Sequence, residues 1–402
     1  MGNVGPRGSA TQEMPIGVDN VVTPPFLPEF GLGIVGSRID GLRNLSHLQG
    51  SLSLSGLENV DNLWDAKNAN LKGKQKLTTL VMEWSSTLSE LQNDRVATDV
   101  LEMLQPHQNL EKLTIKGYNG RKFPTWIGDP SFSKLECLSV TDCKRCRSLP
   151  PLGSLPSLKH LYIKGMDAVK SIGAEFYGYS SSSSKTFASL ETLTFEEMME
   201  WEEWLLPTSD GHMEAFPSLQ ELQIEKCPKL RQQLPQQLPS LLKLHLTECE
   251  QLSVALPQIP RLKILNLRGC NYMQLCSNLA INSLASFELH NISSLRHLPE
   301  WLLQYMPTLK WLVIVDCSDF VHLARCKNDM QYLTSLQHLV IRNCSMLVSL
   351  FEEEQPLPQK LEYLELDSCH SLKKLPHALH SLTALQELII TDCPRLELVP
   401  GT

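Results

Sequence analysis

A six-residue pattern close to L-x-x-L-x-[LIVF] recurs thirteen times in the 402 residues and constrains the fold more than any other feature. The first leucines of these copies are Leu77, Leu110, Leu135, Leu158, Leu190, Leu219, Leu241, Leu262, Leu284, Leu309, Leu336, Leu361 and Leu385. The 308 residues from Leu77 to Leu385 divide into twelve intervals that average about 25.7 residues. A degenerate earlier copy runs through Leu48, Leu52 and Leu54. Repetition at this period predicts a solenoid, in which each turn buries its apolar face against the next turn.

The second leucine of each copy and the apolar residue that follows alternate with polar residues, which is the periodicity of a half-buried β-strand. Leu222 and Ile224, for example, are expected to point inward, and Glu221 and Gln223 outward. Return paths with Leu-Pro steps favour turns and short helical pieces, because proline ends strands and helices. We therefore predict an α/β repeat fold, a leucine-rich-repeat solenoid (horseshoe) with a parallel concave β-sheet and an irregular, short-helical convex side.

The cysteines follow the same register. Eight of the twelve stand eight residues after a first leucine: Cys143, Cys227, Cys249, Cys270, Cys317, Cys344, Cys369 and Cys393. A small buried side chain with a weak donor suits the point where the chain leaves a strand. Zinc at the C-x-x-C of Cys143 and Cys146, or disulfides between stacked turns, are two other interpretations. We favour neither, because no second cysteine pair has ligand spacing and no secretory signal is visible.

The repeat pattern also divides the chain. We expect residues 1–40 to be a poorly ordered N-terminal segment and residues 41–402 to form a solenoid of about 13 to 14 repeats. Inserted loops are predicted near 173–189 and 196–217. The second insertion places Trp201 and Trp204 among five glutamates, so it is either a partner site or a rim loop whose tryptophans pack on the solenoid.

Composition narrows the function classes. A net charge of -8 gives no long-range attraction to nucleic acid or to an anionic membrane, and no apolar run is long enough to span a bilayer. Phosphate-loop, G-x-S-x-G and H-E-x-x-H motifs are absent, and the histidines are scattered over the repeats. We therefore expect a cytoplasmic protein that is not an enzyme, with no catalytic residues and no metal or cofactor site.

Several stretches resemble the leucine-rich-repeat region of plant coiled-coil/nucleotide-binding/leucine-rich-repeat disease-resistance proteins, particularly those of cereals. They are LSHLQGSLSLSGLENV (45–60), DAKNANLKGKQKLTTLVMEWS (65–85), GYNGRKFPTWIGDPSFSKLECLSVTDCKRCRSLPPLGSLPSLKHLYIKGM (117–166), FASLETLTFEEMMEWEEW (187–204) and FPSLQELQIEKCPKL (216–230). Residues 240–402 match a broader class of Cys-type repeats.

The resemblance implies an intracellular immune receptor whose repeats sense pathogen effectors or guarded host proteins and hold a nucleotide-binding domain inactive. The family's coiled-coil and nucleotide-binding parts, with their phosphate loop and Met-His-Asp motif, are missing here, so ATP binding is not carried over. We expect a truncated or partial resistance protein in plant defence, with a protein as partner: an effector, a guarded host protein, or the nucleotide-binding domain of a resistance protein. A leucine-rich-repeat scaffold outside immunity is the alternative.

One part of the predicted concave face stands out as a candidate partner site. Outward positions are polar in most repeats, whereas Trp311, Val313 and Val315 are all apolar on one strand. Val340 lies beside them on the next strand, flanked by His338 and Arg342. An aromatic anchor with polar neighbours is typical of a binding hot spot. The alternative is that a neighbouring loop, residues 319–331, folds over these side chains.

Overall fold

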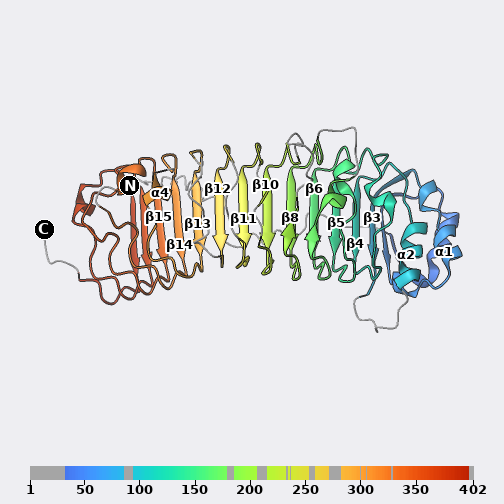
Figure 1. Ribbon diagram of the computed structural model, residues 1–402, viewed down its shortest axis with the longest axis horizontal. Coiled ribbons are helices and arrows are strands. Elements are labelled where there is room, and N and C mark those ends of the chain that lie inside the picture. Colours follow the sequence, from blue (N-terminus) through green and yellow to red (C-terminus); the bar gives the residue numbers. More distant parts are fainter. Residues whose placement is uncertain are drawn as a thin grey trace, which may run out of the picture.

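The structure is a computed structural model that describes residues 32–85, 94–178, 185–205, 215–231, 234–235, 237–252, 259–270, 282–298, 300–304, 306–326 and 329–397. Fifteen strands form one sheet, and each strand pairs in parallel with its neighbours along the chain. Figure 1 shows these strands side by side in chain order, from the blue end of the molecule to the red end. The predicted leucine-rich-repeat solenoid with a parallel sheet is therefore confirmed.

Every copy of the sequence pattern yields a strand. The thirteen strands are β3 (Lys76–Glu83), β4 (Lys112–Lys116), β5 (Cys137–Thr141), β6 (His160–Lys164), β8 (Thr192–Glu196), β10 (Glu221–Glu225), β11 (Lys243–Thr247), β12 (Ile264–Arg268), β13 (Ser286–His290), β14 (Trp311–Val315), β15 (His338–Arg342), β16 (Tyr363–Asp367) and β17 (Glu387–Thr391). The degenerate copy forms β2 (Gln49–Ser55).

The sheet begins before the predicted boundary at residue 41. Strand β1 (Leu32–Val35) pairs in parallel with β2, and a 3₁₀ helix over Gly36–Asn44 leads from one strand to the other. This corrects the assignment of residues 32–40 to a segment outside the solenoid, and it raises the strand number above the predicted 13 to 14 repeats. The sequence signal was missed because 32–35 lacks the leucine spacing of the later copies. Residues 1–31 lie outside the described part of the chain.

The return paths hold short helices, as predicted. The α-helices are α1 (Leu63–Asn68), α2 (Asp94–Met103), α3 (Ala174–Tyr177) and α4 (Glu300–Leu303). Further 3₁₀ turns cover Leu57–Asn59, Leu71–Gly73, Thr125–Gly128, Leu152–Ser154, Asp329–Tyr332 and His377–Ser381. Among the described residues, no helix is long and apolar enough to cross a membrane.

The turn after each strand has a conformation that the sequence pattern does not reveal. If the first leucine of a copy is position 1, the strands from β4 onward cover positions 3 to 7, and position 8 is left-handed in twelve of the thirteen copies, with φ between 47° and 67°. The N–H at position 8 donates to the position-7 carbonyl of the next turn, as from Gly269 to His290 at 2.9 Å and from Asp316 to Arg342 at 3.0 Å. This bond continues the sheet ladder past the end of each strand.

The cysteine at position 9 stabilises the same turn. Seven of the eight register cysteines are buried, Cys393 is half-buried, and the described cysteines are free thiols. Cys270 Sγ donates to its own turn at Arg268 O and to the previous turn at Leu246 O, both at 3.4 Å. Burial raises the pKa of the Cys270 thiol to about 12, so it stays protonated and able to donate. The predicted structural role of these cysteines is confirmed.

The two predicted insertions pack together. Strand β7 (Ser171–Ile172) immediately precedes the first insertion and pairs in parallel with β9 (Glu203–Trp204) of the second. Around them lies what we call the insertion cluster, a group of buried aromatic rings: Phe176, Tyr177, Phe187, Phe195, Trp201, Trp204 and Phe216. Trp204 Nε1 donates to Tyr177 Oη at 2.8 Å. Both tryptophans therefore pack on the solenoid, as the rim-loop interpretation predicts.

Candidate functional site

The face of the sheet opposite the core is the predicted concave face, and we call it the open face. It carries positions 3, 5 and 7 of each strand, whereas positions 4 and 6 are almost completely buried from β2 to β16. All six predicted partner-site residues lie on the open face of β14 and β15. The strand register pairs Trp311 with His338, Val313 with Val340, and Val315 with Arg342. The sequence prediction that these side chains are neighbours is therefore correct.

An aromatic stack crosses this part of the open face. The rings of Trp311 and His338 lie parallel, with centroids 3.5 Å apart and an interplanar angle of 1°. Tyr363, at the same position of β16, continues the row at 5.8 Å from His338. Burial lowers the pKa of His338, so the stacked imidazole is neutral near pH 7. Each side chain is half-buried, so the stack holds an aromatic surface in a fixed orientation.

The rest of the patch is apolar and bounded by an ion pair. Val313 is half-buried, and Val340 retains only 4% of its exposure. Arg342 donates to Glu365 twice, from Nε to Oε1 at 2.6 Å and from Nη2 to Oε2 at 2.8 Å. Burial alone would raise the pKa of Glu365, but hydrogen bonds from Arg342 and Tyr363 outweigh it and lower the pKa. Both side chains are thereby held in position beside the valines.

The alternative in which 319–331 covers the patch is not supported by the described residues of that loop. The N–H of Val321 donates to Arg296 O, and that of Leu323 donates to Leu350 O, both in neighbouring turns. Phe320 is fully buried in the core. The loop therefore belongs to the return path.

A second polar group lies on the open face of β6, β8 and β10. Glu196 accepts hydrogen bonds from Tyr162 Oη at 2.5 Å and from Lys164 Nζ at 2.6 Å. Burial raises the pKa of Glu225, which accepts from Gln223 Nε2 at 2.6 Å. These bonds satisfy the side chains within the sheet itself, so this region is less available to a partner than the patch on β14 and β15.

Two family models match the chain. The model of R13L1/DRL21 leucine-rich repeats matches residues 39–166, and the model of leucine-rich repeats in RPS2-like plant disease resistance proteins matches residues 107–250. The chain is 35% identical to the putative disease resistance RPP13-like protein 1 of Arabidopsis thaliana over 65% of its length. It is 34% identical to the putative disease resistance protein RGA4 of Solanum bulbocastanum over 50% of its length.

The leucine-rich repeats of this chain are similar to those of plant disease-resistance proteins. The chain spans 25% of the Arabidopsis relative and 20% of the Solanum relative. Among solved structures, the leucine-rich repeat domain of the type III effector XopL matches 75% of the chain and 72% of its own length, with 19% identity and a TM-score of 0.31. The expected cereal type stays a prediction.

Sequence reasoning missed two side chains that complete the patch. Tyr363 and Glu365 occupy positions 3 and 5 of the next strand, and the sequence does not distinguish them from the polar outward positions of most repeats. The register makes Tyr363 the neighbour of His338, and Glu365 the neighbour of Val340. An alignment of the repeats with one another would have revealed the aromatic row, because equal positions in successive turns lie side by side.

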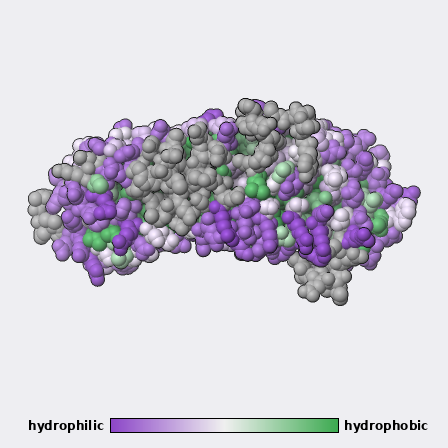
Figure 2. Space-filling view, viewed as in Figure 1, coloured by the Kyte–Doolittle hydropathy of each residue, from purple (hydrophilic) through white to green (hydrophobic). Residues whose placement is uncertain are grey.

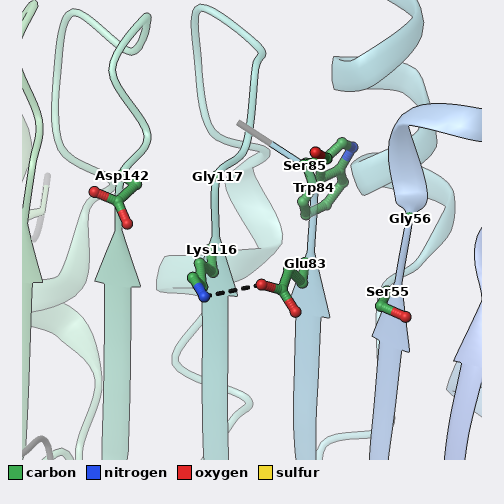
Figure 3. Close-up of a pocket in the computed structure, with 8 residues that line it drawn as sticks. All are labelled: Ser55, Gly56, Glu83, Trp84, Ser85, Lys116, Gly117 and Asp142. Atoms are coloured by element: carbon green, nitrogen blue, oxygen red, sulfur yellow. Dashed lines mark ion pairs between the residues drawn. The ribbon is translucent and has the colours of Figure 1, made fainter. Parts of the chain in front are cut away.

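A small pocket of about 310 Å³ lies far from this patch, at the ends of β2 to β5. Figure 3 shows its lining, in which Lys116 Nζ and Glu83 Oε1 form an ion pair of 2.9 Å across neighbouring strands. Gly117 sits at position 8 next to Trp84, whose ring is buried. The charges of Lys116 and Glu83 in the pocket lining are therefore paired with each other.

Three of the potential metal ligands, Cys143, Cys146 and Asp329, form hydrogen bonds with the backbone. Cys143 and Cys146 are buried, and their Sγ atoms donate to Thr141 O and Gly120 O. The structure also brings ligand atoms of Glu300, Cys326 and Asp329 within 4.8 Å of one another. Asp329 Oδ2 accepts the N–H groups of Arg325 at 3.2 Å and Cys326 at 2.8 Å, which explains its position as a loop-ordering residue.

Proposed function

We propose that the chain is a non-catalytic protein-recognition module in plant defence, acting inside the cell, with its partner on the open face of β14 and β15. Its relatives are disease resistance proteins, and this similarity supports a role in defence. The observation that carries the choice of surface is the Trp311–His338 stack beside Val313 and Val340. The proposed partner is a pathogen effector, a guarded host protein, or the nucleotide-binding domain of a resistance protein.

The physical argument is preorganisation. A tryptophan already stacked on a neighbouring ring loses little freedom when a partner covers it. Most of the coloured surface in Figure 2 is hydrophilic, with small hydrophobic patches, and the outward positions of most other strands are polar. An apolar group at this place therefore gives a partner a distinct position to bind. A scaffold outside immunity would use the same surface but would bind partners unrelated to defence.

The test is a binding screen with Trp311→Ala as the decisive variant. The chain is screened in yeast two-hybrid format against a library of secreted pathogen proteins and against the nucleotide-binding domains of its relatives. Removing a hot-spot tryptophan costs about 2 kcal/mol or more, which weakens binding roughly 30-fold. The affinity of each pair found is then measured by surface plasmon resonance.

Trp64→Ala is the matched control, because Trp64 is 67% exposed on α1 and away from the open face. Its binding should equal that of the unchanged chain, and circular dichroism should show both variants folded. Binding that survives Trp311→Ala at full strength would refute the assignment of this surface. Partners found only among proteins unrelated to pathogens or resistance proteins would favour the scaffold alternative.

A further inference from the structure

Charge is distributed unevenly along the open face. From β2 to β6, positions 3, 5 and 7 carry three lysines and one carboxylate: Lys112, Lys116, Lys164 and Glu83. From β8 to β17 the same positions carry seven carboxylates against three cations, which are Lys243, Arg268 and Arg342. The part of the face that holds the aromatic patch is therefore the acidic part.

Several of these carboxylates are neutralised by the chain itself. Glu196 pairs with Lys164 at 2.6 Å, Glu221 with Lys243 at 3.2 Å, and Glu365 with Arg342 at 2.6 Å. Each of these pairs joins two neighbouring strands of the sheet. Their charges are already compensated and give a partner little additional attraction.

Two carboxylates next to the patch are different. Asp367 at position 7 of β16 accepts from the Thr391 hydroxyl, and Glu387 at position 3 of β17 is exposed. In the described ranges, neither carboxylate forms an ion pair with a lysine or arginine. Arg342 stands opposite Asp367 on the next strand but donates to both oxygens of Glu365, so only its more distant charge acts on Asp367.

The register fixes the geometry of these groups. Moving along the sheet, position 3 reads Trp311, His338, Tyr363 and then Glu387. Neighbouring strands lie about 4.8 Å apart, and Asp367 and Glu387 each stand two positions away from the register partner of Val340, so the two carboxylates lie about 8 and 12 Å from Val340 on opposite sides of its position. An extended chain advances about 3.3 Å per residue, and two or three of its residues cover the shorter of these distances.

We infer that this part of the open face binds a protein segment in which a bulky apolar residue is followed or preceded, two or three residues away, by lysine or arginine. The apolar side chain packs on Trp311 and Val313, and the cation lies beside Asp367 or Glu387, depending on the direction of the segment along the strands. This inference rests on the proposed function, since it names the chemistry of the partner at the same surface. It makes basic–apolar segments favoured ligands and acidic segments disfavoured ones.

The experiment is panning of a random dodecapeptide display library on three immobilised full-length proteins: the unchanged chain, Trp311→Ala, and the double variant Asp367→Lys, Glu387→Lys. On the unchanged chain, enriched peptides should place Lys or Arg two or three residues from Trp, Phe, Leu or Met. The double variant should lose these peptides and enrich acidic ones. Thermal unfolding by circular dichroism checks that the two charge changes, one of them at the half-buried Asp367, leave the fold intact.

Salt dependence provides the second measurement. A synthetic peptide from the enriched set should bind the milder variant Asp367→Asn, Glu387→Gln about tenfold more weakly than the unchanged chain at 50 mM NaCl. That difference should shrink at 500 mM NaCl, because exposed charges are then screened within a few ångströms. The loss caused by Trp311→Ala should persist at both salt concentrations.

The two proposals fail separately. Enriched peptides that require Trp311 but show no preference for Lys or Arg would overturn the charge inference and leave the proposed binding surface standing. Enriched peptides that bind equally well to Trp311→Ala would overturn the surface itself. Absence of any basic–apolar enrichment on the unchanged chain also overturns the inference.

Discussion

Two glycines at equivalent places in the solenoid allow a sharp test of how neighbouring turns are fitted together. Gly117 and Gly269 both occupy position 8, with φ of 67° and 59°. A side chain in this left-handed region costs about 1 kcal/mol at either place. A Cβ added at Gly269 would find its nearest neighbour, Glu248 Cγ, at 3.5 Å, an ordinary contact. Gly269→Ala should therefore lower the free energy of unfolding by about 1 kcal/mol.

Gly117→Ala should cost considerably more, because its Cβ would stand 2.2 Å from the carbonyl oxygen of Trp84. Relief of that clash requires the two turns to separate by roughly an ångström. The hydrogen bonds from Trp84 N to Lys116 O at 2.9 Å and from Gly117 N to Thr141 O at 2.8 Å would then weaken or break. At about 1 kcal/mol for each bond, the total loss is about 3 kcal/mol.

Urea denaturation followed by circular dichroism measures both variants, and hydrogen exchange locates the damage. Gly117→Ala should increase exchange at Trp84 and Gly117, whereas Gly269→Ala should leave these amides protected. Equal losses of stability in the two variants would show that conformation alone decides the cost. The argument from close contact between turns would then be wrong.

Three further predictions concern the core and its titration. Trp201→Ala should destabilise the chain by about 3 to 5 kcal/mol, because its ring is fully buried in the insertion cluster; Trp64→Ala should change stability by less than about 0.5 kcal/mol in the same thermal unfolding assay. The folded pKa of Glu365 lies below its unfolded value, so its stabilisation is present above about pH 4.3 and is lost as the pH falls through the folded pKa. At pH 7 the unchanged chain should be more stable than Glu365→Gln by about 1 kcal/mol, after allowance for the half-exposed Arg342. This difference in the free energy of unfolding should vanish in acid. A difference that stays constant from pH 7 to pH 3 would contradict the ion-pair account. Alkylation with iodoacetamide under native conditions, mapped by mass spectrometry, should modify the exposed Cys326 and leave the buried Cys249 intact; rapid labelling of Cys249 would refute its burial.

The repeating pattern predicted the strands well because it records a requirement that every turn shares. Positions such as Leu222 and Ile224 must be apolar, since each lies against the equivalent residues of two neighbouring turns. The burial of Cys249 and Cys270 follows from the same register. These features depend on sequence spacing alone, so they could be derived without coordinates.

Other features depend on contacts that spacing does not encode. Lys226 and Glu248 are left-handed although neither residue type favours that conformation, and only the ladder bond to the next turn explains it. The segment around Leu32 forms a strand by pairing with β2 rather than through a leucine pattern of its own. The patch on β14 and β15 was found from outward apolar residues, but its stacked geometry required the strand register.

The insertion cluster also sets a limit on how such chains can be rearranged. Ordinary turns of this solenoid are exchangeable modules, because each one contacts only its neighbours through the same set of positions. The two insertions are not exchangeable one at a time, since β7, which leads into the first, pairs with β9 of the second, and their aromatic rings share one interior. Recombination between related genes could shorten or lengthen the array elsewhere by whole turns. A crossover between Ile172 and Trp204 would separate the halves of one packing unit, so viable recombinants should keep this segment intact.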